Sequence, residues 1–146
     1  MKILADTHAL LWLVAEEPAD RIPSPALDLL LDATNELLVS AITPWELSLK
    51  SWRGKLPEAR PLLATWDATM ARLRAVILPL SDKHGILAGH LDWEHRDPFD
   101  RMLAAQAIIE GAVFVSRDAV FDAVPGVRRV WGAGHSASPD ADGAGA

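Results

Sequence analysis

The segment Lys2-Ile3-Leu4-Ala5-Asp6 is a short apolar run that ends at an acidic residue, and it carries the first indication of the fold. Two other runs, Leu37-Leu38-Val39-Ser40-Ala41 and Ala112-Val113-Phe114-Val115, also show no alternation of polar and apolar residues. Such runs are typical of strands buried on both faces, as in a parallel sheet with helices on each side. Val76-Ile77-Leu78 and Val127-Arg128-Arg129-Val130-Trp131 are further candidate strands, and the stronger alternation of the second favours a sheet edge.

Helical patterns fill the intervals between these strands. We expect helices at residues 7–16, 25–34, 44–52, 61–75, 83–91 and 98–110, with a short helical turn at 119–123. Proline stands at the start of several of them, where its missing N–H group forfeits no hydrogen bond. The alternation of strands and helices predicts an α/β protein with a three-layer α/β/α sandwich around a short parallel sheet.

The composition indicates one folded domain. Of the 146 residues, 50% are hydrophobic, which excludes a disordered chain. The absence of cysteine excludes disulfides and thiolate chemistry and agrees with a reducing cytoplasm. We expect the domain to span residues 1–132. The tail at 133–146, rich in Gly, Ala and Ser, is expected to be disordered.

Neither an export signal nor a membrane span is expected, and the predicted location is the cytoplasm. The first apolar run meets Asp6 too early for a signal-peptide core, and the longest apolar stretch, residues 9–15, is too short to cross a bilayer. The chain has 14 Lys and Arg against 20 Asp and Glu, for a net charge of −6. This balance argues against a stable nucleic-acid binder that acts by phosphate neutralisation, and it leaves room for a metal-dependent enzyme.

Four acidic residues lie where the expected elements join. Asp6 ends the first strand, and Asp118 follows the fourth. Glu46 lies in the first turn of the helix after the second strand, and Asp100 lies in the first turn of the helix before the fourth. Ligands of open α/β folds bind at the carboxyl ends of the strands. We therefore expect Asp6, Glu46 and Asp118 to converge there, with Asp100 joining them if its helix points to that edge.

Each acid also has a purely structural interpretation, which the sequence leaves open. Asp6, Asp97 and Asp118 each precede an expected helix or turn and could cap it. Asp100 stands three residues after Asp97, the spacing of a capping box. Glu46 could form an exposed i,i+4 pair with a lysine on its own helix.

Four carboxylates at one edge would repel one another, and a divalent cation would relieve that repulsion. Oxygen ligands without cysteine favour Mg²⁺, with Mn²⁺ as the alternative. Because Mg²⁺ keeps several waters, we expect Asp6 and Asp100 to bind it directly and Glu46 and Asp118 to act through bound water. Such a site is suited to phosphodiester hydrolysis.

Several motifs together resemble the PIN domain, and VapC-type toxins in particular. They are Asp6-Thr7-His8, Pro44-Trp45-Glu46-Leu47-Ser48, the stretch at 95–107 that begins His95-Arg96-Asp97-Pro98-Phe99-Asp100, and Ser116-Arg117-Asp118-Ala119-Val120-Phe121. The resemblance covers about Lys2 to Trp131, and the 95–107 stretch is its most specific part. It implies a Mg²⁺-dependent endoribonuclease with four catalytic acids, which acts as a toxin, pairs with a VapB-type antitoxin and forms a homodimer.

Basic and aromatic residues give weaker indications. Lys50 and Arg53 follow the second acid on its helix, while Arg101 and Arg117 neighbour two other acids. They hold RNA phosphates or balance local charge, and the sequence leaves both possibilities open. The histidines lack a ligand-like spacing, and the six tryptophans are expected in the core or facing a partner rather than stacked on bases.

The first expected helix is apolar on every side between Ala9 and Ala15. Because packing on a sheet hides only one face of a helix, we expect Trp12 or Leu13 to lie at an antitoxin or dimer surface.

The leading hypothesis is therefore a metal-dependent ribonuclease that acts as a toxin. Two alternatives stay open: a catalytically silent PIN-like protein-binding module, and a metal-dependent nuclease outside any toxin system. Retention of all four acids argues against the silent module.

Overall fold

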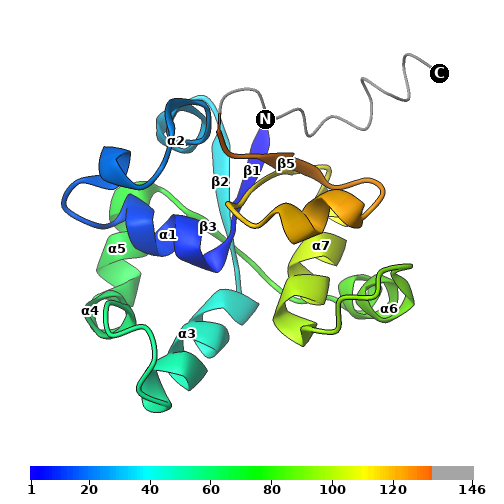
Figure 1. Ribbon diagram of the computed structural model, residues 1–146. Helices are drawn as coiled ribbons and strands as arrows, with labels where there is room; N and C mark the ends of the chain where they lie inside the picture. Colours follow the sequence, from blue (N-terminus) through cyan, green and yellow to red (C-terminus); the bar gives the residue numbers. More distant parts are fainter. Residues whose placement is uncertain (133–146) are drawn as a thin grey trace.

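The sheet has five parallel strands in the order β3-β2-β1-β4-β5 (Figure 1). This computed structural model describes residues 1–132, so the tail expected to be disordered lies outside the described residues. The strands are β1 (Lys2–Ala5), β2 (Glu36–Ser40), β3 (Val76–Leu78), β4 (Val113–Val115) and β5 (Arg128–Val130). The run that ends at Asp6 is the central strand. The more alternating run is an edge strand, as the sequence predicted.

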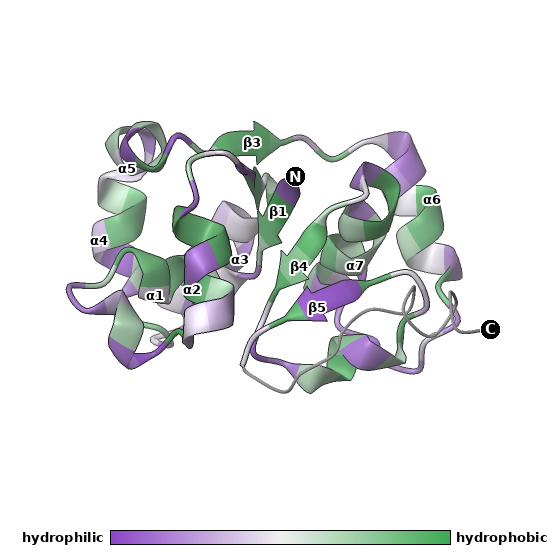
Figure 2. Cartoon of the chain, turned by 90° about the horizontal axis from the view of Figure 1, so that it is seen from above, coloured by the Kyte–Doolittle hydropathy of each residue, from purple (hydrophilic) through white to green (hydrophobic). Residues whose placement is uncertain are grey.

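Helices cover both faces of this sheet. They are α1 (Thr7–Leu13), α2 (Ser24–Leu31), α3 (Ile42–Trp52), α4 (Ala59–Ala64), α5 (Trp66–Leu73), α6 (Asp82–His90) and α7 (Pro98–Glu110), with 3₁₀ turns η1 (Pro18–Asp20) and η2 (Ala119–Ala123). Figure 2 shows the strands, which are mostly apolar except for β5, between two groups of helices, α1 to α5 on one side and α6 and α7 on the other.

Successive strand residues point into two separate cores, which explains the unbroken apolar runs. Ile3 and Ala5 belong to the core beneath α1, α2, α4 and α5. Leu4 and Phe114 belong to the core beneath α7, together with Phe121 of η2. The expected α/β/α sandwich is confirmed.

One expected helix, at residues 61–75, is two helices. The chain leaves helical backbone at Thr65, where φ is −118° and ψ is 24°, so α4 ends and α5 begins on either side of it. The hydroxyl of Thr65 donates to the carbonyl oxygen of Pro61 at 2.8 Å. Such a local side-chain bond offers the backbone an alternative to continuing the helix, and neither Gly nor Pro marks the break.

Trp12 and Leu13, which were expected at an antitoxin or dimer surface, are mostly buried within the single chain. The two residues are only 7% and 6% exposed in the single chain. Trp131, just after β5, packs on the Trp12 ring with the ring centroids 5.8 Å apart, and the Arg117 guanidinium lies 4.9 Å from the centroid of the same ring. Later segments of the same chain therefore cover much of the apolar outer face of α1.

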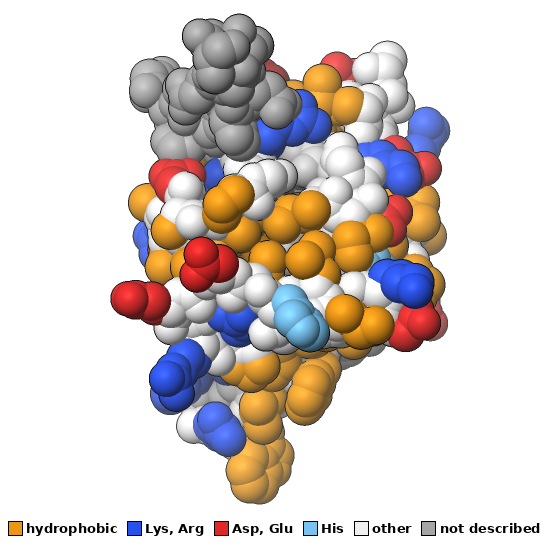
Figure 3. All heavy atoms as spheres, turned by 90° about the vertical axis from the view of Figure 1, so that its right-hand side faces the viewer, with side chains coloured by type: hydrophobic (Ala, Val, Ile, Leu, Met, Phe, Trp, Pro, Cys, Tyr) orange, Lys and Arg blue, Asp and Glu red, His pale blue; other side chains and the backbone are white. Residues whose placement is uncertain are grey.

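Large apolar side chains that do reach solvent lie elsewhere. On α3, Trp45 is 61% exposed and Trp52 is 85% exposed, and on α6 Ile86 is 59% exposed. Figure 3 looks onto the side where α6 lies and shows hydrophobic side chains gathered there. Among residues 1–132, no helix is both long and apolar enough to cross a membrane.

Candidate metal centre

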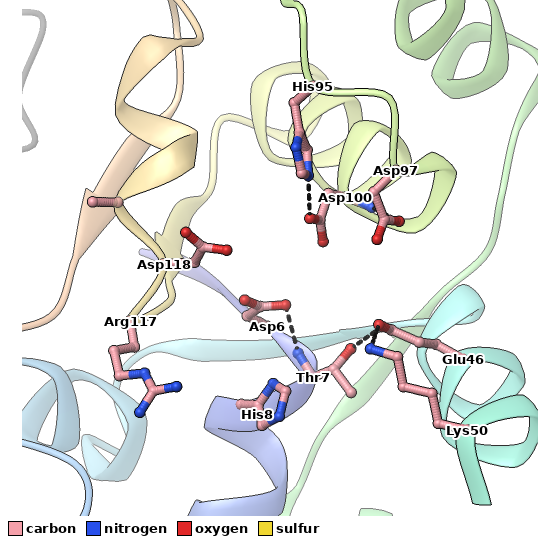
Figure 4. A pocket seen from close by; sticks show the side chains of 11 residues that line it. Asp6, Thr7, His8, Glu46, Lys50, His95, Asp97, Asp100, Arg117 and Asp118 are labelled. Carbon is pink, nitrogen blue, oxygen red and sulfur yellow. Dashed lines mark hydrogen bonds and ion pairs between the residues drawn. The ribbon is translucent and has the colours of Figure 1, made fainter. Parts of the chain in front are cut away.

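A pocket of about 570 Å³ lies at the carboxyl edge of the sheet, and all four predicted acids line it (Figure 4). Parallel strands deliver Asp6 and Asp118 to this edge, and the following helices begin there. Helix α7 starts at the same edge because a crossover helix runs back antiparallel to the strands it connects. The lining residues are Asp6, Thr7, His8, Glu46, Lys50, His95, Asp97, Asp100, Arg117, Asp118 and Ala119.

Asp6 is held rigidly at the end of β1. Its backbone N–H donates to the carbonyl oxygen of Val115 at 2.9 Å, which continues the pairing of β1 with β4. Its carboxylate accepts from the Thr7 backbone N–H at 2.7 Å and from the Ser116 hydroxyl at 2.6 Å. The Ser116 oxygen also accepts from the backbone N–H of Asp118 at 3.0 Å. Asp6 is therefore both the cap of α1 and a pocket acid, and the sequence offered no signal for its bond to Ser116.

Glu46 is a buried acid with two partners, which corrects the interpretation of an exposed pair. Its residue is 4% exposed, and its two carboxylate oxygens accept from the Thr7 hydroxyl at 2.5 Å and from Lys50 Nζ at 2.6 Å. Burial opposes the charge on Lys50, but the hydrogen bond and the charge of Glu46 outweigh it and raise the pKa of Lys50. The lysine therefore stays positive inside the pocket.

Asp100 approaches the pocket from the first turn of α7, and His95 is its partner. Nε2 of His95 lies 2.6 Å from Oδ2 of Asp100. Asp97 caps the helix as predicted, accepting from the backbone N–H groups of Phe99 at 2.9 Å and Asp100 at 3.3 Å. His95, Asp97 and Asp100 each offer a ligand atom within 4.8 Å of the others. The contribution of His95 was missed because the sequence does not show that its loop folds back onto α7.

Asp118 and Arg117 form the more open rim of the pocket. Asp118 is exposed and caps η2 by accepting from the Val120 backbone N–H at 3.0 Å, as the structural interpretation predicted. Arg117 lines the pocket beside it, whereas Arg53 is exposed and is not among the lining residues in the described chain.

Burial and the neighbouring Lys50 lower the pKa of His8, so this pocket histidine is neutral at pH 7.

Arg101 is not among the residues that line the pocket, and its guanidinium binds backbone carbonyl groups instead. Its Nε donates to the carbonyl oxygen of Ala88 at 2.8 Å, and its Nη2 donates to that of Leu91 at 2.8 Å. Its Nη1 donates to the carbonyl oxygens of Trp93 at 2.7 Å and His95 at 2.9 Å. The guanidinium therefore fixes the loop that carries His95 to Asp100.

The electrostatics of the pocket fit a divalent cation. Burial raises the pKa of Asp6 from 3.8 to about 7, against the hydrogen bonds from Ser116 and Thr7, and the charges of Asp100 and Glu46 add to the shift. Burial likewise raises the pKa of Asp100 from 3.8 to about 6, against the hydrogen bond from His95. A positive ion would stabilise the charged forms of these two buried carboxylates. Their oxygen atoms are the hard donors that Mg²⁺ and Mn²⁺ prefer.

These raised pKa values predict how the stability of the metal-free protein depends on pH. Because folded Asp6 holds its proton up to about pH 7 and an unfolded aspartate releases it near 3.8, stability is lost as the pH rises between those values. From pH 5.5 to pH 8 the loss from Asp6 is on the order of 2 kcal/mol.

Urea unfolding in EDTA at the two pH values measures this loss. The Asp6→Asn variant keeps an acceptor for Thr7 and should show a smaller decrease. An identical decrease in both proteins would contradict the assignment of the raised pKa to Asp6.

The fold and this acidic edge define an α/β protein whose carboxylates gather where parallel strands end. The chain belongs to the PIN domain family, which it matches over residues 3–127. A comparison with curated protein sequences gave no match.

Solved structures share the fold at low sequence identity. VapBC2 from Rickettsia felis, bound to a DNA fragment from its promoter, gives a TM-score of 0.63 at 20% identity, covering 90% of this chain and 99% of that chain. DNA-bound VapBC from Salmonella typhimurium gives a TM-score of 0.63 at 22% identity, covering 89% of this chain and 97% of that chain. FitAB bound to an IR36 DNA fragment gives a TM-score of 0.59 at 17% identity, covering 89% of this chain and 94% of that chain. At these identities the likeness shows a common fold.

Proposed function

We propose that this protein is a Mg²⁺-dependent endoribonuclease that acts as the toxin of a toxin–antitoxin pair. The observation that carries the proposal is the convergence of Asp6, Glu46, Asp100 and Asp118 on one pocket in a PIN domain. A binding module has no use for two carboxylates whose burial raises their pKa values.

Asp6 and Asp100 are proposed to hold the ion directly, while Glu46 and Asp118 act through bound water. When bound, Mg²⁺ would supply an activated water and stabilise the negative charge that develops on the phosphate. Thr7 and Lys50 orient Glu46 by occupying one lone pair on each of its oxygens. Lys50 and Arg117 bring positive charge to the same pocket, where they are placed to attract a phosphate of the RNA backbone.

Metal dependence is tested by incubating the purified protein with total RNA in Mg²⁺, in Mn²⁺ and in EDTA. We expect cleavage with either ion and none with EDTA, with recovery when Mg²⁺ is returned. Asp100→Asn protein purified in parallel controls for contaminating ribonucleases. Equal cleavage in EDTA and in Mg²⁺ would exclude the metal mechanism, and no cleavage under any condition would favour the silent module.

A VapB-type antitoxin, a homodimer and a cytoplasmic location complete the proposal. Support comes from the fold shared with chains of VapBC complexes. If a small open reading frame lies directly upstream of the gene, its product should copurify with this chain and suppress cleavage. A nuclease outside any toxin system would show neither effect.

A further inference from the structure

An exposed aromatic side chain directly precedes one of the pocket acids on α3. Trp45 is 61% exposed and directly precedes Glu46, so the Cα atoms of the two residues are about 3.8 Å apart. Phe99, which directly precedes Asp100, meets the Trp45 ring at 5.0 Å between centroids with an interplanar angle of 73°. Helices α3 and α7 thus each carry a pocket acid whose preceding residue is aromatic, and the two aromatic rings are in contact.

The edge-on contact limits how the Trp45 ring can move and leaves much of its surface in solvent. Aromatic pairs of this geometry are favourable, so Phe99 braces Trp45 in one orientation. An indole held this way beside a hydrolytic site can stack on a flat apolar ring. Each nucleobase has such a face, and a base–aromatic stack tolerates any sequence.

The net charge of the chain makes such a contact useful. At −6 the protein repels a polyanion overall, and few cations line its pocket. Stacking on an uncharged base adds affinity without phosphate neutralisation and is insensitive to salt compared with ion pairing.

We propose that Trp45, braced by Phe99, is the stacking platform for an unpaired nucleobase next to the phosphate that is cleaved. The inference rests on the proposed ribonuclease function and assigns Trp45 a role in positioning its substrate. It reverses the sequence-based expectation that the tryptophans serve the core or a protein partner. A protein partner is the less favoured occupant, because Trp45 directly precedes Glu46 and its ring contacts Phe99, which directly precedes Asp100.

Trp52 is the matched control. It lies on the same helix seven residues on, about 10 Å farther along the axis, and is 85% exposed. A protein that covered this face of α3 would contact both tryptophans, whereas a base held at the pocket would contact Trp45 alone.

The test uses a short single-stranded RNA with a mapped cleavage site and copies of it with one abasic position each. We expect Trp45→Ala to lower kcat/KM by about 5- to 150-fold, mostly through KM, and Trp45→Phe to lose less. One abasic position should produce a similar loss with the parent protein and little further loss with Trp45→Ala. Trp52→Ala should match the parent.

The stacking proposal would be overturned if Trp45→Ala lowered kcat/KM by the same factor on every abasic RNA as on the intact RNA. So would equal effects of Trp45→Ala and Trp52→Ala on copurification of a partner with kcat/KM unchanged. If the parent cleaves no RNA, the ribonuclease proposal fails separately. Stacking is then judged by intrinsic fluorescence, where quenching by a single-stranded oligonucleotide must be lost in Trp45→Phe, and persistent quenching rejects it.

Discussion

Asp100→Asn is expected to reduce RNA cleavage by roughly two orders of magnitude or more without lowering the stability of the metal-free protein. The substitution removes a proposed direct ligand, and with it the charge that holds the ion that activates water. It also removes a carboxylate whose pKa burial raises to about 6, so the folded protein loses an unfavourable charge. Calorimetry with Mg²⁺ or Mn²⁺ should show weaker binding, and urea unfolding in EDTA should show an unchanged or higher free energy.

Asp97 provides the matched control three residues away. Its carboxylate caps α7, so Asp97→Ala should lower the free energy of unfolding by about 1 kcal/mol and retain measurable cleavage. Asp97→Asn keeps a capping acceptor and should recover most of that stability. The assignment of Asp100 to the metal would be abandoned if Asp100→Asn cleaved RNA at nearly the parent rate in Mg²⁺.

Arg101→Met is expected to lower the free energy of unfolding by about 2–4 kcal/mol. The substitution removes the guanidinium that donates to four backbone carbonyl groups. Polar groups left without a partner in a partly buried loop destabilise the folded state. Cleavage should fall as well, because the same loop carries His95 to Asp100.

Two variants control for this effect, and both are measured by urea unfolding. Arg101→Lys should recover little stability, since an ammonium cannot reproduce the planar fork that reaches four acceptors. Arg53→Met removes an exposed arginine at the C-cap of α3 and should change the free energy by less than about 0.5 kcal/mol. Equal stability of Arg101→Met and the parent would show that the loop holds its shape without the guanidinium.

Much of the fold could be predicted because its signals are local. The unbroken apolar runs around Ile3 and Phe114 report burial on both faces, whichever helices provide it. Helix α7 has the predicted bounds because Asp97 and Pro98 mark its start, while Gly111 ends it with a φ of 62°. The break at Thr65 escaped prediction because it depends on a side-chain hydrogen bond and not on Gly or Pro.

The candidate site could be predicted in outline but not in its contacts. The rule that ligands meet parallel sheets at the carboxyl ends of the strands brought Asp6, Glu46 and Asp118 to one edge. That rule concerns topology and is silent on distances between side chains. The bond between Asp6 and Ser116, which are 110 residues apart in the chain, could therefore be found only in the folded protein.

By itself, the sequence determined the α/β architecture and the edge at which the acids gather, since hydropathy runs and caps act within a few residues. The central place of Lys2–Ala5 in the sheet was decided by the strand order of the folded chain. Tertiary structure alone assigned the partners: His95 to Asp100, Arg101 to its loop, and Trp131 to the outer face of Trp12. Apolar periodicity shows that a surface is covered but not what covers it. Long-range packing answers that question, and here Trp131 from the end of the domain covers Trp12 on the first helix.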